Sequence, residues 1–179
     1  MNRDQLAHLL RAAGNATGQL EILVIGSQAI LGTFDPAELP DVTTVSIEAD
    51  LGILDDDDDQ TSDLIDGVIG EFSPFHVMYG YYGQGISVTT AVLPDGWRGR
   101  LVLFETAATQ PARGWCLEPH DLIIAKLVRG DPKDYDFADA LVRVDAVHPS
   151  VLSDRLALTD LSDAVCARIG RWINAGSRG

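Results

Sequence analysis

Short apolar runs separated by polar turns are the main regularity along this chain. Ile22 to Ile25 is a run of four residues that are β-branched or Leu, and Gly26-Ser27 follows at once. This pattern predicts a buried strand, a tight turn, and a helix from Gly26 to Leu31. The next run, Val42 to Ala49, is rich in Thr, Val and Ile and predicts a second strand.

Other stretches repeat their apolar residues at helical or strand spacing. The helical pattern predicts five further helices: Arg3–Ala13 (with Gly14-Asn15 as a stop), Thr61–Ile69, a helix that begins at Glu118-Pro119, Tyr135–Val144 and Leu161–Ile173. Two more strands are predicted at Ile86–Leu93 and Leu101–Phe104, and His148-Pro149 marks a loop.

This order of elements predicts an α/β or α+β fold, in which helices flank a mixed sheet and the C-terminal part is helical. The 179 residues are about the length of one domain. We therefore expect one domain over residues 1–179, with the sheet core in 1–110 and mainly helices in 115–175.

Charge narrows the possible partners. The net charge is −14, which argues against non-specific binding of nucleic acid because such binding needs a basic face. Of the thirteen Lys and Arg residues, only Arg3 and Arg11 precede Arg98. An anionic ligand in the first half could therefore meet only metal ions or backbone N–H groups. Any side-chain cation for it has to come from the second half.

The remaining bulk features favour a cytoplasmic protein. The polar N-terminus is unlike a signal peptide, and no apolar run approaches the length that spans a membrane. Cys116 and Cys166 are far apart and have no metal-binding spacing, so we expect reduced thiols.

The strongest candidate chemistry lies at the end of the second predicted strand. Glu48 and Asp50 are two residues apart, and side chains at positions i and i+2 of a strand point to the same face. Two neighbouring acids repel one another unless solvent or a cation lies between them. With the Gly26-Ser27 turn beside it, this pair predicts a site for Mg²⁺ and a nucleotide.

Two other polar clusters allow two interpretations each. The run Asp55–Asp59 could collect cations, or could be a solvated loop whose charge favours the start of the helix Thr61–Ile69. Trp97, Arg98 and Arg100 could contact a base or a phosphate, or could brace the turn at Pro94-Asp95-Gly96, and we favour bracing.

Several segments, taken in order, resemble a known superfamily. GSQAI after a strand and SIEADL on a later strand are similar to the Gly-Ser and acid-x-acid signature of nucleotidyltransferases of the DNA polymerase beta-like superfamily. The resemblance is to minimal bacterial members related to abortive-infection and toxin nucleotidyltransferases. The segments LPDGWRGRL, GWCLEPHDLIIAKLVRG and KDYDFADAL also resemble an uncharacterised bacterial family of that superfamily, in which a P-x-D-L-x-x-x-K helix precedes a helix with Lys/Arg-Asp.

This resemblance, which covers Glu21 to Leu141, implies roles for individual residues. Gly26 and Ser27 would hold the phosphates of a nucleoside triphosphate, and Glu48 and Asp50 would bind Mg²⁺. Lys126 would reach a phosphate, although a lysine extending from a helix edge to solvent is the alternative interpretation. Asp134 or Asp136 would match a downstream acid. The implied reaction moves a nucleotidyl group to an acceptor hydroxyl.

The sequence also departs from the superfamily pattern. Glu48 stands where Asp is usual, and the segment Gln84–Ala91, where a third acid is expected, has no carboxylate. Two hypotheses follow. The first is a Mg²⁺-dependent nucleotidyltransferase that acts on an unknown acceptor. The second is a catalytically inactive protein of the same fold that serves as a toxin–antitoxin or defence-system binding module with a protein partner.

Overall fold

The computed structural model describes residues 1–54 and 60–176, and the acidic run Asp55–Asp59 lies outside the described residues. The strands are β1 (Glu21–Val24), β2 (Glu48–Gly52), β3 (Tyr82–Gly85), β4 (Val102–Phe104) and β5 (Arg113–Cys116). The α-helices are α1 (Arg3–Thr17), α2 (Asp41–Thr44), α3 (Gln60–Ile69), α4 (Pro74–Tyr79), α5 (Pro119–Arg129), α6 (Pro132–Arg143), α7 (Pro149–Ala157) and α8 (Asp163–Gly176). Short 3₁₀ helices are η1 (Ser27–Gly32), η2 (Pro36–Glu38), η3 (Val88–Thr90) and η4 (Trp97–Arg100).

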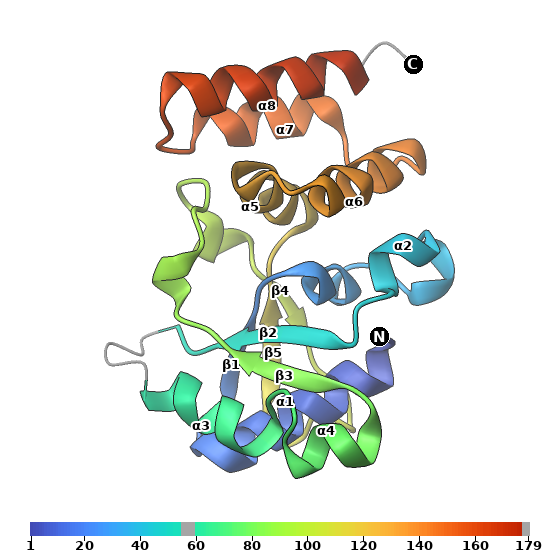
Figure 1. Cartoon of the computed structure of the whole chain (residues 1–179), viewed down its shortest axis with the longest axis vertical. Helices are drawn as coiled ribbons and strands as arrows, with labels where there is room; N and C mark the ends of the chain where they lie inside the picture. Colours follow the sequence, from blue (N-terminus) through green and yellow to red (C-terminus); the bar gives the residue numbers. More distant parts are fainter. Residues whose placement is uncertain (55–59, 177–179) are drawn as a thin grey trace.

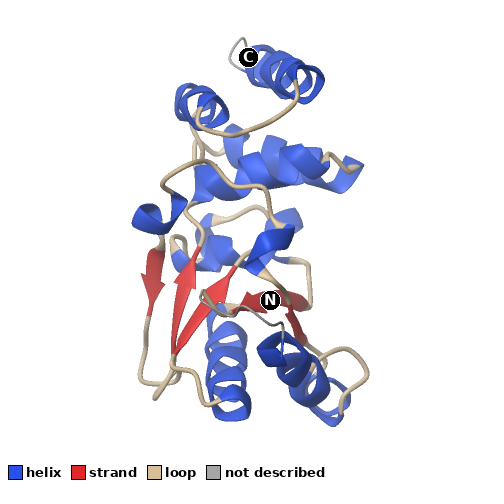
Figure 2. Cartoon of the chain, turned by 90° about the vertical axis from the view of Figure 1, so that its left-hand side faces the viewer, coloured by secondary structure: helices blue, strands red, loops and turns tan. Residues whose placement is uncertain are grey.

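The five strands form one mixed sheet in the order β3-β2-β1-β5-β4. β1 pairs antiparallel with β2 and parallel with β5, while β2 pairs parallel with β3. Figure 1 shows α1, α3 and α4 at one end of the molecule and α5 to α8 stacked at the other, with the sheet between them; Figure 2 shows the same arrangement from the side. The predicted mixed sheet flanked by helices is confirmed, and its fifth strand, β5, lies beyond residue 110.

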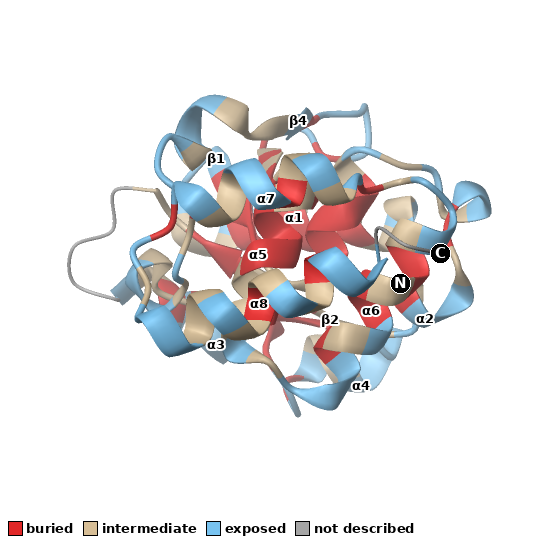
Figure 3. Ribbon diagram, turned by 90° about the horizontal axis from the view of Figure 1, so that it is seen from above, coloured by how far each residue is buried: buried red, intermediate tan, exposed pale blue. Residues whose placement is uncertain are grey.

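The main core lies between the sheet and its covering helices. Ile22, Leu23 and Val24 of β1 are fully buried, as are Leu6, Leu9 and Leu10 of α1. Viewed from above, α5 is mostly buried, whereas α7 and α8 also carry exposed residues (Figure 3). Among the described residues, no helix is long and apolar enough to cross a membrane. Both cysteines are free thiols.

The predicted end of the first helix at Gly14 is wrong, because α1 continues to Thr17. A Cβ on Gly14 would lie 2.7 Å from the Cβ of Ala112, so this glycine allows close packing inside the helix. Gly18, with φ +73°, is the residue that ends α1.

The second predicted strand is wrong over most of its length. Asp41–Thr44 forms the short helix α2, and β2 begins only at Glu48. Thr43 donates both its backbone N–H and its hydroxyl to the carbonyl of Pro40, at 2.9 and 2.7 Å. These local hydrogen bonds outweigh the strand preference of the Thr/Val-rich run.

The predicted strand Ile86–Leu93 is also wrong, because β3 lies earlier, at Tyr82–Gly85. A Cβ on Gly85 would lie 2.0 Å from the carbonyl oxygen of Ser62 in α3, so only glycine lets α3 lie this close to the strand. Glycine has a low strand propensity, so the sequence pattern did not reveal this strand.

The predicted loop at His148-Pro149 contains the start of α7, whose single buried residue, Leu152, gives little helical pattern.

Candidate active site

A cavity of about 580 Å³ lies between β2, the turn after β1, and the helices α5 and α6. Its lining includes all five residues that the sequence predicts for the site: Gly26, Ser27, Glu48, Asp50 and Lys126. These residues come from the turn after β1, from β2 and from α5. The structure therefore brings together side chains that are up to a hundred residues apart in the chain.

Gly26 allows the turn after β1 to lie directly against Asp50. Its φ is +57°, in the left-handed region, and a Cβ at this position would lie 1.6 Å from Asp50 Oδ2. The neighbouring Ile25 N–H donates to the carbonyl of Asp50 at 3.0 Å. Both the backbone conformation and the available space require glycine here.

Glu48 and Asp50 face the cavity, while Ala49 between them is buried on the opposite side of β2. Burial raises the pKa of Asp50 to about 6, and repulsion from Glu48 and a hydrogen bond with Glu48 add to the rise. The positive charge of Lys126 opposes these effects only in part. The carboxylate pair is thus unfavourable when both groups are ionised.

Tyr82 contacts this pair from the neighbouring strand. It lies opposite Glu48 in the pairing of β2 with β3, and its hydroxyl donates to Glu48 Oε2 at 2.6 Å. Burial, followed by the hydrogen bond to Glu48, raises the pKa of the Tyr82 hydroxyl. No sequence pattern selects Tyr82, because its partner is 34 residues away and the strand that carries it was not predicted.

Lys126 points from α5 toward the turn after β1. Its Nζ donates to Ser27 Oγ at 2.9 Å and lies 3.3 Å from Asp134 Oδ1. Its side chain is only 7% exposed, so it does not extend to solvent from the helix edge. Burial lowers the pKa of Lys126, although the negative charge of Asp134 opposes the shift.

The two candidate downstream acids have different surroundings. Asp134 is fully buried and binds Arg129 Nε at 2.8 Å as well as Lys126, so it fixes both cations. Asp136 is exposed and lines the cavity. Arg129 and Lys133 also line the cavity. Together with Lys126, they show that the basic residues of this cavity come from the second half of the chain, as the charge distribution predicts.

The carboxylate pair suits a hard divalent cation. Mg²⁺ prefers carboxylate oxygens and usually keeps water or substrate phosphates as its other ligands. A divalent cation would also relieve the repulsion that raises the pKa of Asp50. In residues 1–54 and 60–176, no group of three or more His, Cys, Asp or Glu side chains is arranged to hold a metal, and the residue that pairs with Asp50 on β3 is Gln84. Glu48 and Asp50 would therefore supply the protein ligands without a third carboxylate from β3.

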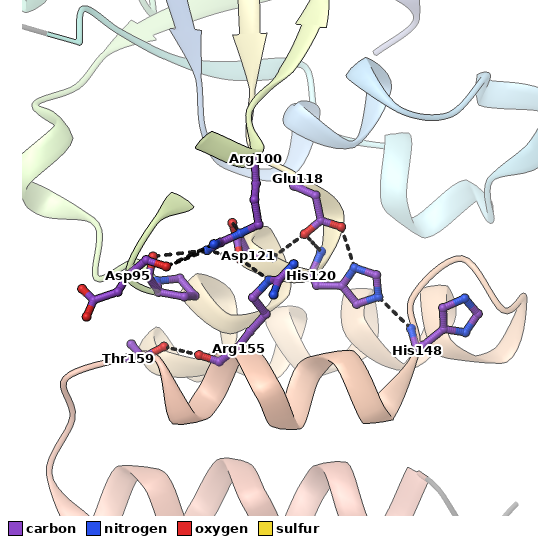
Figure 4. A network of polar contacts seen from close by, with 9 residues as sticks. Asp95, Arg100, Glu118, His120, Asp121, His148, Arg155 and Thr159 are labelled. Carbon is purple, nitrogen blue, oxygen red and sulfur yellow. Dashed lines mark hydrogen bonds and ion pairs between the residues drawn. The ribbon is translucent and has the colours of Figure 1, made fainter. Parts of the chain in front are cut away.

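The Trp97–Arg100 patch lies in a separate polar network. Arg100 Nε donates to Asp121 Oδ2 at 2.8 Å, and its Nη1 donates to the carbonyl of Asp95 at 3.1 Å (Figure 4). Arg155 Nε lies 3.0 Å from Asp121 Oδ1. Arg100 therefore braces the turn at Pro94-Asp95-Gly96 against α5, in agreement with the favoured interpretation.

A family comparison assigns the chain to the nucleotidyltransferase class. The model of the family described as "Nucleotidyltransferase of unknown function (DUF6036)" matches residues 4–170. The chain belongs to this family. Searches of curated proteins and of solved structures gave no significant match.

Proposed function

We propose that this protein is a Mg²⁺-dependent nucleotidyltransferase that moves a nucleotidyl group from a nucleoside triphosphate to an acceptor hydroxyl. The supporting observation is that Ser27, the Glu48–Asp50 pair and Lys126 line one cavity, with Lys126 Nζ 2.9 Å from Ser27 Oγ. Membership of a nucleotidyltransferase family supports the reaction class. The proposed substrates are the triphosphate and an acceptor of unknown identity.

Each residue of the cavity has a role in this proposal. Glu48 and Asp50 hold Mg²⁺, which when bound supplies positive charge to the phosphates. Ser27 and the backbone at Gly26 bind phosphate oxygens. Lys126 is fixed by Asp134 and neutralises phosphate charge beside Ser27.

The reaction itself forms one bond and breaks one. The acceptor oxygen bonds to the α-phosphorus while the bond from that phosphorus to the β-phosphate oxygen breaks. Pyrophosphate leaves, and the acceptor proton passes to solvent. The protein contributes mainly by placing the reacting atoms in line and by stabilising charge.

Calorimetry with Mg²⁺ and each of the four nucleoside triphosphates tests this proposal. We expect one triphosphate to bind the wild type, and Asp50→Asn, which keeps the side-chain shape, to weaken that binding at least tenfold. Asp139→Asn, a change on the α6 surface beside Trp172, is the control and should bind as the wild type does. Absence of binding at millimolar nucleotide would exclude a nucleotidyltransferase.

The second candidate function is an inactive nucleotidyltransferase fold that acts as a toxin–antitoxin or defence-system module and binds a protein partner. Two observations favour it: β3 supplies Gln84 beside Asp50 instead of an acid, and Phe72, Val77 and Met78 around α4 are 72–81% exposed. Under this candidate, Asp50→Asn spares the cellular phenotype, whereas Phe72→Ser with Val77→Ser removes it. The opposite result would support the transferase.

A further inference from the structure

Of the two carboxylate side chains, that of Glu48 is the more flexible. Its side chain has one methylene more than that of Asp50, and therefore one more rotatable bond. Asp50 has the shorter side chain and packs directly against Gly26, where a Cβ would lie 1.6 Å from Asp50 Oδ2. A metal ligand needs a fixed position, so something else has to restrain the longer Glu48 side chain.

Tyr82 meets this requirement. Its hydroxyl donates to Glu48 Oε2 at 2.6 Å, a short hydrogen bond to a carboxylate. Its ring is buried and packs against the ring of His76, with centroids 4.7 Å apart. Because β2 and β3 pair at Glu48 and Tyr82, the backbone also fixes the distance between the two residues.

We propose that Tyr82 is the positioning residue for Glu48: it holds one carboxylate oxygen so that the group faces Asp50 across a shared divalent-cation site. This inference rests on the proposed function, because it assigns Tyr82 to the cation site of that function. Tyr82 itself contacts neither the ion nor the substrate. Its hydroxyl restrains the Glu48 side chain before the ion binds, so less conformational entropy is lost on binding.

The adjacent residue provides a matched control. Tyr81 is as buried as Tyr82, at 8% exposure, and its hydroxyl also forms one side-chain hydrogen bond, to His8 Nδ1 at 2.8 Å. Successive residues of an extended segment point to opposite sides, so the Tyr81 hydroxyl lies away from Glu48. Tyr81→Phe and Tyr82→Phe therefore remove equivalent atoms from two different environments.

The test measures binding of Mn²⁺ alone, as a spectroscopic substitute for Mg²⁺, by the electron paramagnetic resonance signal of free Mn²⁺ at pH 8. Acidic segments elsewhere, including Asp55–Asp59, will bind some of the ion, so Asp50→Asn defines the background. After this background is subtracted, the remaining Mn²⁺ binding reports the Glu48–Asp50 site. We expect Tyr82→Phe to weaken Mn²⁺ binding at that site about tenfold. Tyr81→Phe should leave it unchanged, and thermal unfolding confirms that each variant is folded.

A second comparison separates positioning from a general structural role. The carboxylate of Glu48→Asp is one methylene shorter and no longer reaches the Tyr82 hydroxyl. Adding Tyr82→Phe to Glu48→Asp should therefore change Mn²⁺ affinity less than twofold. Equal affinities of Tyr82→Phe and the wild type, or the same tenfold loss in the Glu48→Asp background, would overturn the inference. If the wild type binds no more Mn²⁺ than Asp50→Asn, the cation site of the proposed function fails first, and the role of Tyr82 fails with it.

Discussion

Two acidic sites in this protein differ in the charge of the groups that surround them. Asp121 is fully buried, and two arginines neutralise it, with Arg100 Nε at 2.8 Å and Arg155 Nε at 3.0 Å (Figure 4). Asp50 is only partly buried, and the charged group with the largest effect on its pKa is another carboxylate, Glu48.

This difference indicates a structural role for Asp121 and a candidate functional role for the Glu48–Asp50 pair. The Asp121 network joins η4, α5 and α7, and two guanidinium groups oppose the burial that raises the pKa of Asp121. The Glu48–Asp50 pair faces a cavity, and mutual repulsion adds to the burial that raises the pKa of Asp50, which is why we propose that a cation binds there. An unfavourable charge arrangement in a cavity is typical of functional sites.

The largest effect on stability is expected when the Asp121 network is broken. Asp121→Ala leaves Arg100 and Arg155 next to one another without their carboxylate, and should cost about 3–5 kcal/mol of unfolding free energy. Urea denaturation measures this loss. Asp154→Ala, at an exposed position one residue from Arg155, is the control and should change stability by less than about 0.5 kcal/mol. A loss below about 1 kcal/mol for Asp121→Ala would remove the contrast between the two groups.

Removing the charge of Asp50 in the cavity is expected to increase the unfolding free energy, whereas removing that of Asp121 decreases it. The folded-state pKa of Asp50, about 6, is above the unfolded value of 3.8, so the contribution of Asp50 to stability falls as the pH rises from about 4 through 6. Asp50→Asn cannot ionise and should be more stable than the wild type by about 2–3 kcal/mol at pH 8, with no such gain at pH 3. Denaturation at pH values from 3 to 8 measures the difference, and a gain independent of pH would contradict the assignment.

Mg²⁺ should reduce the cost of ionising the pair. At a concentration ten times its Kd, the ion should raise wild-type stability by about 1.4 kcal/mol at pH 8. Asp50→Asn should lose this stabilisation, because it removes one of the two carboxylates that hold the ion. Thermal unfolding with and without Mg²⁺ gives the two values. Equal stabilisation of both proteins would mean that the ion binds elsewhere.

The smallest effect is expected at an exposed ion pair, where solvent already stabilises both charges. Arg113 and Glu21 lie 2.8 Å apart, but their side chains are 43% and 48% exposed. Arg113→Gln should therefore change the unfolding free energy by less than about 1 kcal/mol. The same urea experiment applies, and a loss as large as that of Asp121→Ala would show that burial does not explain the comparison.

Features that depend on neighbouring residues could be predicted from the sequence alone. The spacing of Glu48 and Asp50 placed both on one face of β2, and the apolar run before Gly26 placed the turn at the end of β1. Pro119 and the helical pattern after it located α5 and therefore Lys126. These features follow from backbone periodicity and turn chemistry, which act over a few residues.

Contacts between residues that are distant in the chain could not be predicted in this way. Lys126 reaches Ser27 across 99 residues, and Tyr82 reaches Glu48 across 34. The position of β3 depended on α3 packing against Gly85, and Gly14 inside α1 allows close packing against Ala112. Local patterns carry no information about such contacts, because close packing and charge pairing depend on segments that folding alone brings together.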